Sequence, residues 1–177
     1  MTIKAGDKMP SGTLKTMTPD GARDLTTEEL FKGKTVVLFS VPGAFTPTCD
    51  AKHLPGYVQQ AAAIRAKGVD TIACMAVNDV FVMNAWGKAS GTGSDVLMLA
   101  DGNGDYAKAL GLEMDGRGFG MGPLFPIAII ASPSSARRKA CRHRAISAQI
   151  PRRFRRPAPG SFCRARSGSR SIPTIAT

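Results

Sequence analysis

Residues 35–41, Thr-Val-Val-Leu-Phe-Ser-Val, form an apolar and mostly β-branched run of the length of one strand. Apolar residues on both faces of a strand indicate a central position in a sheet that is covered on both sides. An amphipathic stretch at 47–67 follows this run and predicts a long helix, with a kink at Pro55 and an end at Gly68. A buried strand that leads into a helix restricts the chain to folds with both kinds of element in alternation.

Strand and helix patterns alternate along the rest of the first 110 residues. The further elements that we expect are a hairpin with strands at 14–17 and 23–26, a short helix at 27–31, strands at 69–77 and 96–100, and helices at 80–89 and 106–110. This alternation predicts an α/β fold, with βαβ units and a mainly parallel sheet that has helices on both faces. The 177 residues suffice for one domain that needs no disulfide or metal to hold its core.

The charge of the chain is divided between two unlike parts. Residues 1–132 carry 12 basic and 13 acidic side chains, whereas residues 133–177 carry 12 basic side chains and no acidic one. The second part also lacks the hydrophobic periodicity of a packed element. We therefore predict a globular domain over 1–132 and an Arg-rich, disordered tail over 133–177.

Three interpretations of the tail stay open. A basic arm for nucleic acid or a membrane surface fits the charge, but electrostatics alone gives only non-specific binding. A divergent extension is the second interpretation. The third, which we favour, is an out-of-frame translation, because Arg, Pro, Ala, Ser and Gly dominate the tail. Under that interpretation the fold lacks its edge strand.

The cysteines and the first residues bear on cofactors and location. The four cysteines, Cys49, Cys74, Cys141 and Cys163, show no C-x-x-C spacing and no histidines at metal-ligand intervals, so we expect neither a metal nor a cofactor. Residues 1–7 lack the charged and then apolar pattern of an export signal. No apolar run approaches the roughly 18–20 residues that span a bilayer. We expect a cytoplasmic protein with free or catalytic cysteines.

Cys49 lies between the strongest strand and the longest helix. Thr46 suits the N-cap of that helix and Pro47 its first position, which places Cys49 in the first turn. Free N–H groups and the helix dipole favour an anion there, so we expect a lowered pKa and a nucleophilic thiolate. The alternative is that Cys49 is a small buried apolar residue near a helix start.

Pro42, Thr46 and Cys49 match the motif P-x-x-x-T-x-x-C, and residues 52–57 and 77–86 extend the match. Over about residues 3–122 the chain resembles the peroxiredoxin family, in the branch that includes the plant type II proteins. The resemblance implies a thioredoxin-like fold with an added N-terminal hairpin. It also implies that Cys49 attacks hydrogen peroxide or an organic hydroperoxide and becomes a sulfenic acid, with Thr46 and Pro42 shaping the pocket.

The resemblance also implies the partners. The electron donor in this branch is glutathione with glutaredoxin, thioredoxin, or a second cysteine of the same chain, and the protein is a homodimer. Cys74 lies where that second cysteine occurs in some members. The alternative is that Cys74 is a core residue, because its neighbours on the strand are apolar and it would have to move to meet Cys49. The alternative function is a redox-inactive thioredoxin-fold module that binds nucleic acid through its basic tail.

The chain departs from the family pattern after Gly122. Family members carry an Arg in a stretch like Gly-x-Arg-Ser-x-Arg-Tyr, whereas residues 122–127 read Gly-Pro-Leu-Phe-Pro-Ile. The resemblance assigns that Arg to thiolate stabilisation and peroxide binding. We therefore expect an impaired enzyme, and a C-terminal strand and helix replaced by the irregular basic tail.

Overall fold

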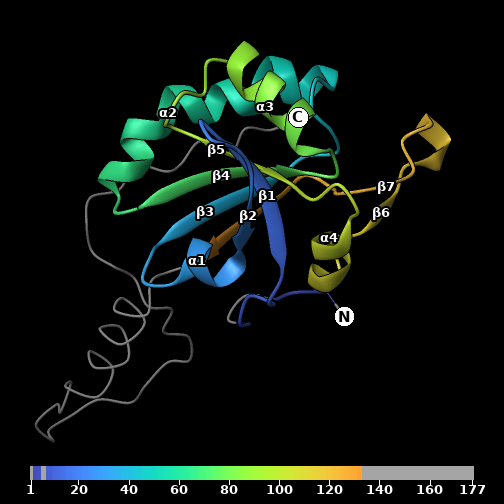
Figure 1. Cartoon of the computed structure of the whole chain (residues 1–177), viewed down its shortest axis with the longest axis horizontal. Helices are drawn as coiled ribbons and strands as arrows, with labels where there is room; N and C mark the ends of the chain where they lie inside the picture. Colours follow the sequence, from blue (N-terminus) through green and yellow to red (C-terminus); the bar gives the residue numbers. More distant parts are fainter. Residues whose placement is uncertain (1, 5–6, 133–177) are drawn as a thin grey trace, which may run out of the picture.

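Six strands form a mixed sheet at the centre of the molecule, and helices cover both of its faces (Figure 1). The computed structural model describes residues 2–4 and 7–132. The sheet has the order β2-β1-β5-β4-β3-β8. Its strands are β1 (Thr13–Thr18), β2 (Gly21–Thr26), β3 (Val36–Ser40), β4 (Thr71–Ala76), β5 (Leu97–Ala100) and β8 (Ala128–Ser132). The central β3, β4 and β5 are parallel, as the βαβ pattern predicts.

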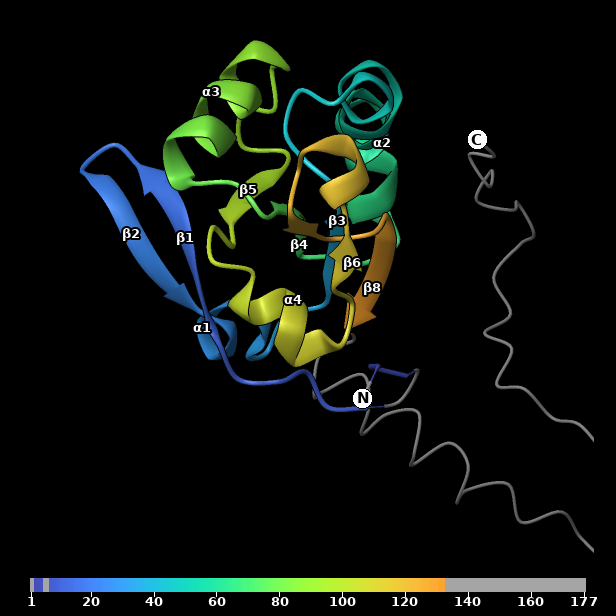
Figure 2. The ribbon, with the colours of Figure 1, turned by 90° about the vertical axis from the view of Figure 1, so that its right-hand side faces the viewer.

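The N-terminal hairpin lies at one side of the sheet (Figure 2). β1 pairs with β2 along its whole length, from Thr13 opposite Thr26 to Thr18 opposite Gly21. Gly21 has a φ of 118°, a conformation that favours glycine. Thr26 then caps α1 (Thr27–Phe31): its hydroxyl accepts from the Glu29 N–H while the Glu29 carboxylate accepts from the Thr26 N–H. The predicted hairpin and short helix are both present.

The helices divide the core into two halves. α2 (Leu54–Ala66) and α3 (Val80–Ala89) lie on one face of the sheet, and α1 and α4 (Asp105–Leu110) on the other (Figure 1). Alternate residues of each strand serve the two halves, so Phe39 packs in the α2 and α3 half and Leu38 in the α1 and α4 half. Within the described ranges, no helix has the length and apolarity needed to cross a membrane.

The predicted helix over 47–67 is not one regular helix. Pro47 and Thr48 are helical, Cys49–His53 form a π-helical turn (η1), and α2 begins at Leu54. The Leu54 N–H bonds to the carbonyl of Cys49, five residues earlier. Pro55, which has no N–H to donate, is the second residue of α2, and the π-helical turn directly precedes it. The wide turn therefore replaces the expected kink.

One strand follows residue 122 that the sequence patterns did not predict. β8 runs antiparallel to β3, from Ala128 opposite Ser40 to Ser132 opposite Val36. The apolar, β-branched sequence of residues 127–131 suits an edge strand, and Ile130 packs against the core beside Leu38. A small hairpin of β6 (Met114–Asp115) and β7 (Pro123–Leu124) precedes it, with a 3₁₀ turn, η2 (Arg117–Phe119), at its tip.

The predictions for the tail fall on residues 133–177, which lie outside the described residues. The domain boundary at residue 132, and the replacement of a C-terminal strand and helix by the tail, therefore stay predictions.

Candidate active site

Cys49 lies at the first turn after β3, as the sequence predicts. The carbonyl of Thr46 accepts the first helical hydrogen bond, from the Asp50 N–H at 2.9 Å, so Thr46 holds the N-cap position and Cys49 the third helical position. The Cys49 side chain is 2% exposed and belongs to the core between the sheet and the helices α2 and α3. The thiol is thus held at a helix start but is shielded from bulk water.

Two neighbours act on the Cys49 sulfur. The Thr46 side chain and the Gly43 backbone form hydrogen bonds that lower the Cys49 pKa. The Thr46 hydroxyl also lies 2.8 Å from the Gly43 carbonyl, and its single proton serves either this carbonyl or the sulfur. Thr46 and Gly43 are thus the loop residues that hydrogen-bond to the sulfur.

Burial nevertheless dominates the titration of this thiol. Desolvation raises the pKa of Cys49 above its ordinary value and outweighs the bonds from Thr46 and Gly43. Among the described residues, no cationic side chain contributes to lowering it. The prediction of a lowered Cys49 pKa is therefore wrong, because the helix start that carries this thiol is buried.

The loop before Cys49 has a strained backbone at Phe45. Phe45 has a φ of 58°, in the left-handed region that a bulky residue rarely adopts. Its ring is half exposed and tilts toward the indole of Trp86, with the centroids 6.3 Å apart. Pro42 is half-buried and begins the loop next to Gly43. Pro42, Thr46 and Cys49 are thus brought together on one short loop at the end of β3.

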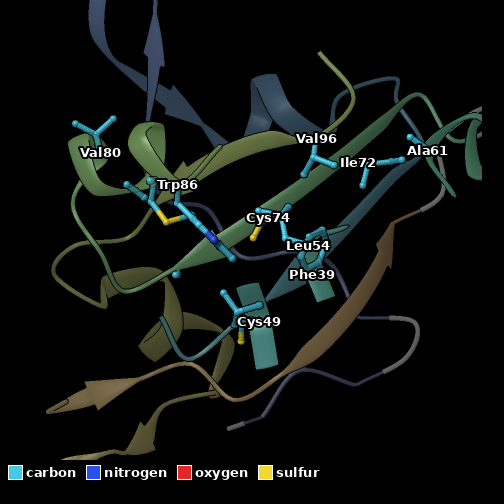
Figure 3. Close-up of a cluster of buried hydrophobic side chains, with 13 residues drawn as sticks. Phe39, Cys49, Leu54, Ala61, Ile72, Cys74, Val80, Trp86 and Val96 are labelled. Atoms are coloured by element: carbon cyan, nitrogen blue, oxygen red, sulfur yellow. The ribbon is translucent and has the colours of Figure 1, made fainter. Parts of the chain in front are cut away.

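Cys74 lies in the middle of β4, paired with Phe39 of β3, and is fully buried. It belongs to the same half of the core as Cys49, but the sulfur of Cys49 points away from it in the view of Figure 3. Burial, and then the charge of Cys49, raises the pKa of Cys74 well above its ordinary value. Both cysteines are free thiols. The two residues are neighbours across the core, and no bond joins them.

Three side chains around the loop escaped the sequence interpretation as site residues. The Asn78 side chain accepts a hydrogen bond from the Ala44 N–H at 2.9 Å, and the Trp86 indole donates to the Asp50 carboxylate at 2.6 Å. The signal for Asn78 and Trp86 lay in residues 77–86, which extend the family motif, but a motif does not say which side chain reaches the loop.

Ile127 lies at the end of β8 that is nearest the active-site loop. The register ends with Ala128 opposite Ser40, and its continuation by one residue would put Ile127 opposite Val41, directly before the loop. The Ile127 side chain is 56% exposed. Arg117, on η2, is paired with Asp115 at 2.8 Å and exposed to solvent. The described residues contain no group of His, Cys, Asp and Glu that could hold a metal ion.

A buried cysteine at the first turn after a central strand, in a thioredoxin-like sheet with an N-terminal hairpin, defines a thiol-based redox protein. The redoxin family model matches residues 4–133. Peroxiredoxin-2B of Arabidopsis thaliana is 46% identical over 121 residues, which cover 68% of this chain and 75% of that protein. The chain belongs to the peroxiredoxin family.

Two further comparisons support the assignment. The chloroplastic peroxiredoxin-2E-2 of Oryza sativa is 55% identical over 117 residues, 64% of this chain and 52% of that protein. The crystal structure of reduced Prx3 of Vibrio vulnificus in complex with H₂O₂ is similar with a TM-score of 0.71 and 50% identity, and covers 73% of this chain and 81% of that one. The chain spans about half the length of the 2E-type relatives, at 52% and 50%.

Proposed function

We propose that the protein is a thiol peroxidase that reduces hydrogen peroxide and organic hydroperoxides through Cys49. The thiolate attacks one peroxide oxygen, the O–O bond breaks, and the other oxygen leaves with both bonding electrons as alkoxide or hydroxide and takes up a proton. Cys49 becomes a sulfenic acid. Thr46 and Gly43 hold the sulfur, and Pro42 shapes the pocket.

One observation carries this proposal: the Cys49 sulfur is buried at a helix start and receives hydrogen bonds from Thr46 and Gly43. A structural cysteine of the core needs no such donors. The Prx3 structure in complex with H₂O₂ supports the peroxide as substrate for this chain.

The reducing partner is a thiol, and two routes are open to it. In the first, Cys74 attacks the sulfenic acid, which forms a Cys49–Cys74 disulfide and releases water. Thioredoxin then reduces this disulfide. In the second, glutathione attacks, and glutaredoxin reduces the mixed disulfide. The second route is supported because Cys74 is fully buried in a central strand and the Cys49 sulfur points away from it (Figure 3).

The oligomeric state and location are further parts of the proposal. A homodimer is supported by two exposed aromatic rings, Phe45 on the loop at 50% and Phe81 in the first turn of α3 at 69%. Sedimentation of the reduced protein measures this state. The cytoplasmic location stays a prediction, and two relatives are named chloroplastic. Binding of nucleic acid rests on residues 133–177 alone and finds no support in the comparisons.

The function is tested with one equivalent of hydrogen peroxide on the reduced chain, followed by trapping of sulfenic acid and peptide mass spectrometry. We expect the trap at Cys49, faster formation than on free cysteine, and no turnover in Cys49→Ser. Non-reducing mass spectrometry without the trap separates the two routes by a Cys49–Cys74 disulfide or a glutathione adduct. A Cys49→Ser chain that still consumes peroxide would rule out the proposal.

A further inference from the structure

The loop that carries Cys49 is tied at both ends to one neighbouring segment. At its start the Ala44 N–H donates to the Asn78 side chain at 2.9 Å, and at its end the Trp86 indole donates to the Asp50 carboxylate at 2.6 Å. Cys49 lies between the two ties. Asn78 comes directly before Asp79, which caps α3 by accepting from two of its first N–H groups. Both ties therefore start from α3 and its capped end.

Trp86 is fixed in the core and can therefore hold the loop in place. Its side chain is fully buried in the same half of the core as Cys49, with Leu54 in the same cluster (Figure 3). An indole N–H in such a place costs free energy unless it finds an acceptor, and Asp50 is its acceptor. Because Asp50 follows Cys49 in the chain, a shift of its carboxylate moves the cysteine as well.

The turn itself needs such support. η1 is a π-helical turn, which has weaker local support than an α-helical one. The two hydrogen bonds at the sulfur, from Thr46 and Gly43, depend on short distances and weaken steeply when the geometry is lost. A small displacement of the turn would leave the buried thiolate without either donor.

We propose that Trp86 is a positioning residue for Cys49 that acts through Asp50, with Asn78 as the second tie. The inference rests on the proposed role of Cys49 as nucleophile and adds the residues that keep its sulfur within reach of Thr46 and Gly43. Trp86 and Asn78 hold the loop and take no part in the bond changes.

Variants separate the effect of the Trp86–Asp50 hydrogen bond from the effects of the Asp50 charge and of the Trp86 ring. Trp86→Phe keeps a buried ring and removes the donor, Asp50→Ala removes the acceptor at an exposed position, and Asp50→Asn keeps an acceptor oxygen. Asp24→Ala is the matched control, because it removes the same carboxylate from an exposed position on β2 of the N-terminal hairpin. Thermal unfolding shows that each variant is folded.

Two rates are measured on each chain by peptide mass spectrometry: sulfenic acid formation at Cys49 with hydrogen peroxide, and alkylation of Cys49 by iodoacetamide as a function of pH. We expect Trp86→Phe and Asp50→Ala to slow both rates about tenfold at neutral pH and to move the alkylation midpoint to higher pH, as loss of one charge-assisted hydrogen bond does. Asp50→Asn should retain most of the rate, and the double variant should be no slower than the slower single one.

Unchanged rates in both Trp86→Phe and Asp50→Ala overturn the proposal. So do an Asp50→Asn chain as slow as Asp50→Ala, or losses that multiply in the double variant. If the unaltered chain forms no sulfenic acid, the peroxidase function fails, whereas the alkylation profile still tests the positioning role, since it needs no peroxide.

Discussion

The rings of Phe39 and Tyr57 lie face to face, with centroids 3.8 Å apart and planes 6° apart. Phe39 is the strand partner of Cys74, so the stack joins α2 to the sheet beside the buried thiol. Burial, and then the charge of Cys74, raises the pKa of Tyr57. Movement of α2 and the turn before it would have to disturb this stack to expose Cys74.

Tyr57→Ala should therefore both destabilise the chain and open Cys74. We expect the free energy of unfolding to fall by about 2–4 kcal/mol, from the lost burial and the lost aromatic pair. Denaturant unfolding measures this change, and the alkylation rate of Cys74 in the native state should rise. Tyr57→Phe keeps the stack and serves as the control. If Cys74 is alkylated equally slowly in both variants, the stack does not guard it.

The buried Cys74 predicts a loss of stability at alkaline pH. Its folded pKa lies well above the unfolded value of 9.0, so above that value the unfolded chain releases a proton that the folded chain retains. The free energy of unfolding is then unaffected by this group below about pH 8 and falls as the pH rises through about 9 to 10. Urea unfolding across this range should show a smaller fall for Cys74→Ala. Equal slopes for the two chains would contradict the burial of an un-ionised thiol.

The raised pKa of Cys49 predicts that its peroxide reaction quickens with pH. At neutral pH the thiolate is a minor species, and its population grows about tenfold per pH unit until the pKa is reached. Thr46→Val removes the hydroxyl and should lower the rate at neutral pH by roughly tenfold to a hundredfold, whereas Thr46→Ser keeps the donor. Stopped-flow measurement of sulfenic acid formation gives both. A rate independent of pH between about 7 and 9 would show that Cys49 is already ionised.

Placing a cation opposite Val41 should improve the reaction. Ile127 precedes β8 and points to solvent near the start of the loop, so Ile127→Arg brings a guanidinium to the end of the sheet where Cys49 lies. We expect a lower alkylation midpoint for Cys49 and a peroxide rate about tenfold higher. Ile129→Arg, two residues along the same strand face and about 7 Å further away, is the charge-matched control. Equal gains in the two variants would point to a general charge effect.

Much of the fold was predictable from local patterns. The hairpin, α1, α3 and the parallel strands β3, β4 and β5 follow from turn residues, caps and the alternation of strand and helix patterns. β8 was not predicted, because the residues after Gly122 lack the family pattern, although residues 127–131 are apolar and β-branched. Pairing with β3 then places this run in the sheet.

Part of the candidate site was likewise predictable from local sequence, and part was not. Cys49, Thr46 and Pro42 share one stretch of chain, so a helix start and a motif sufficed to place them together. The ties from Asn78 and Trp86 join positions about 34 to 36 residues apart in the sequence, and only the packing of α3 against the loop reveals them. The helix start predicted a lowered Cys49 pKa, but burial raises this pKa, and burial depends on the packing of the whole core.

The π turn fixes the angular relation between Cys49 and α2. Cys49 and Leu54 are five positions apart, and both are buried on the same side. In an α-helix five positions rotate a side chain by about 500°, which would turn one of the two about 140° away from the core. The wider turn takes up that excess. A chain shortened by one exposed residue of η1, such as Ala51, would bring the two to a four-residue separation that an ordinary helix accommodates. Segment length and burial are therefore coupled here, because removal of one residue changes the type of helix that keeps both side chains in the core.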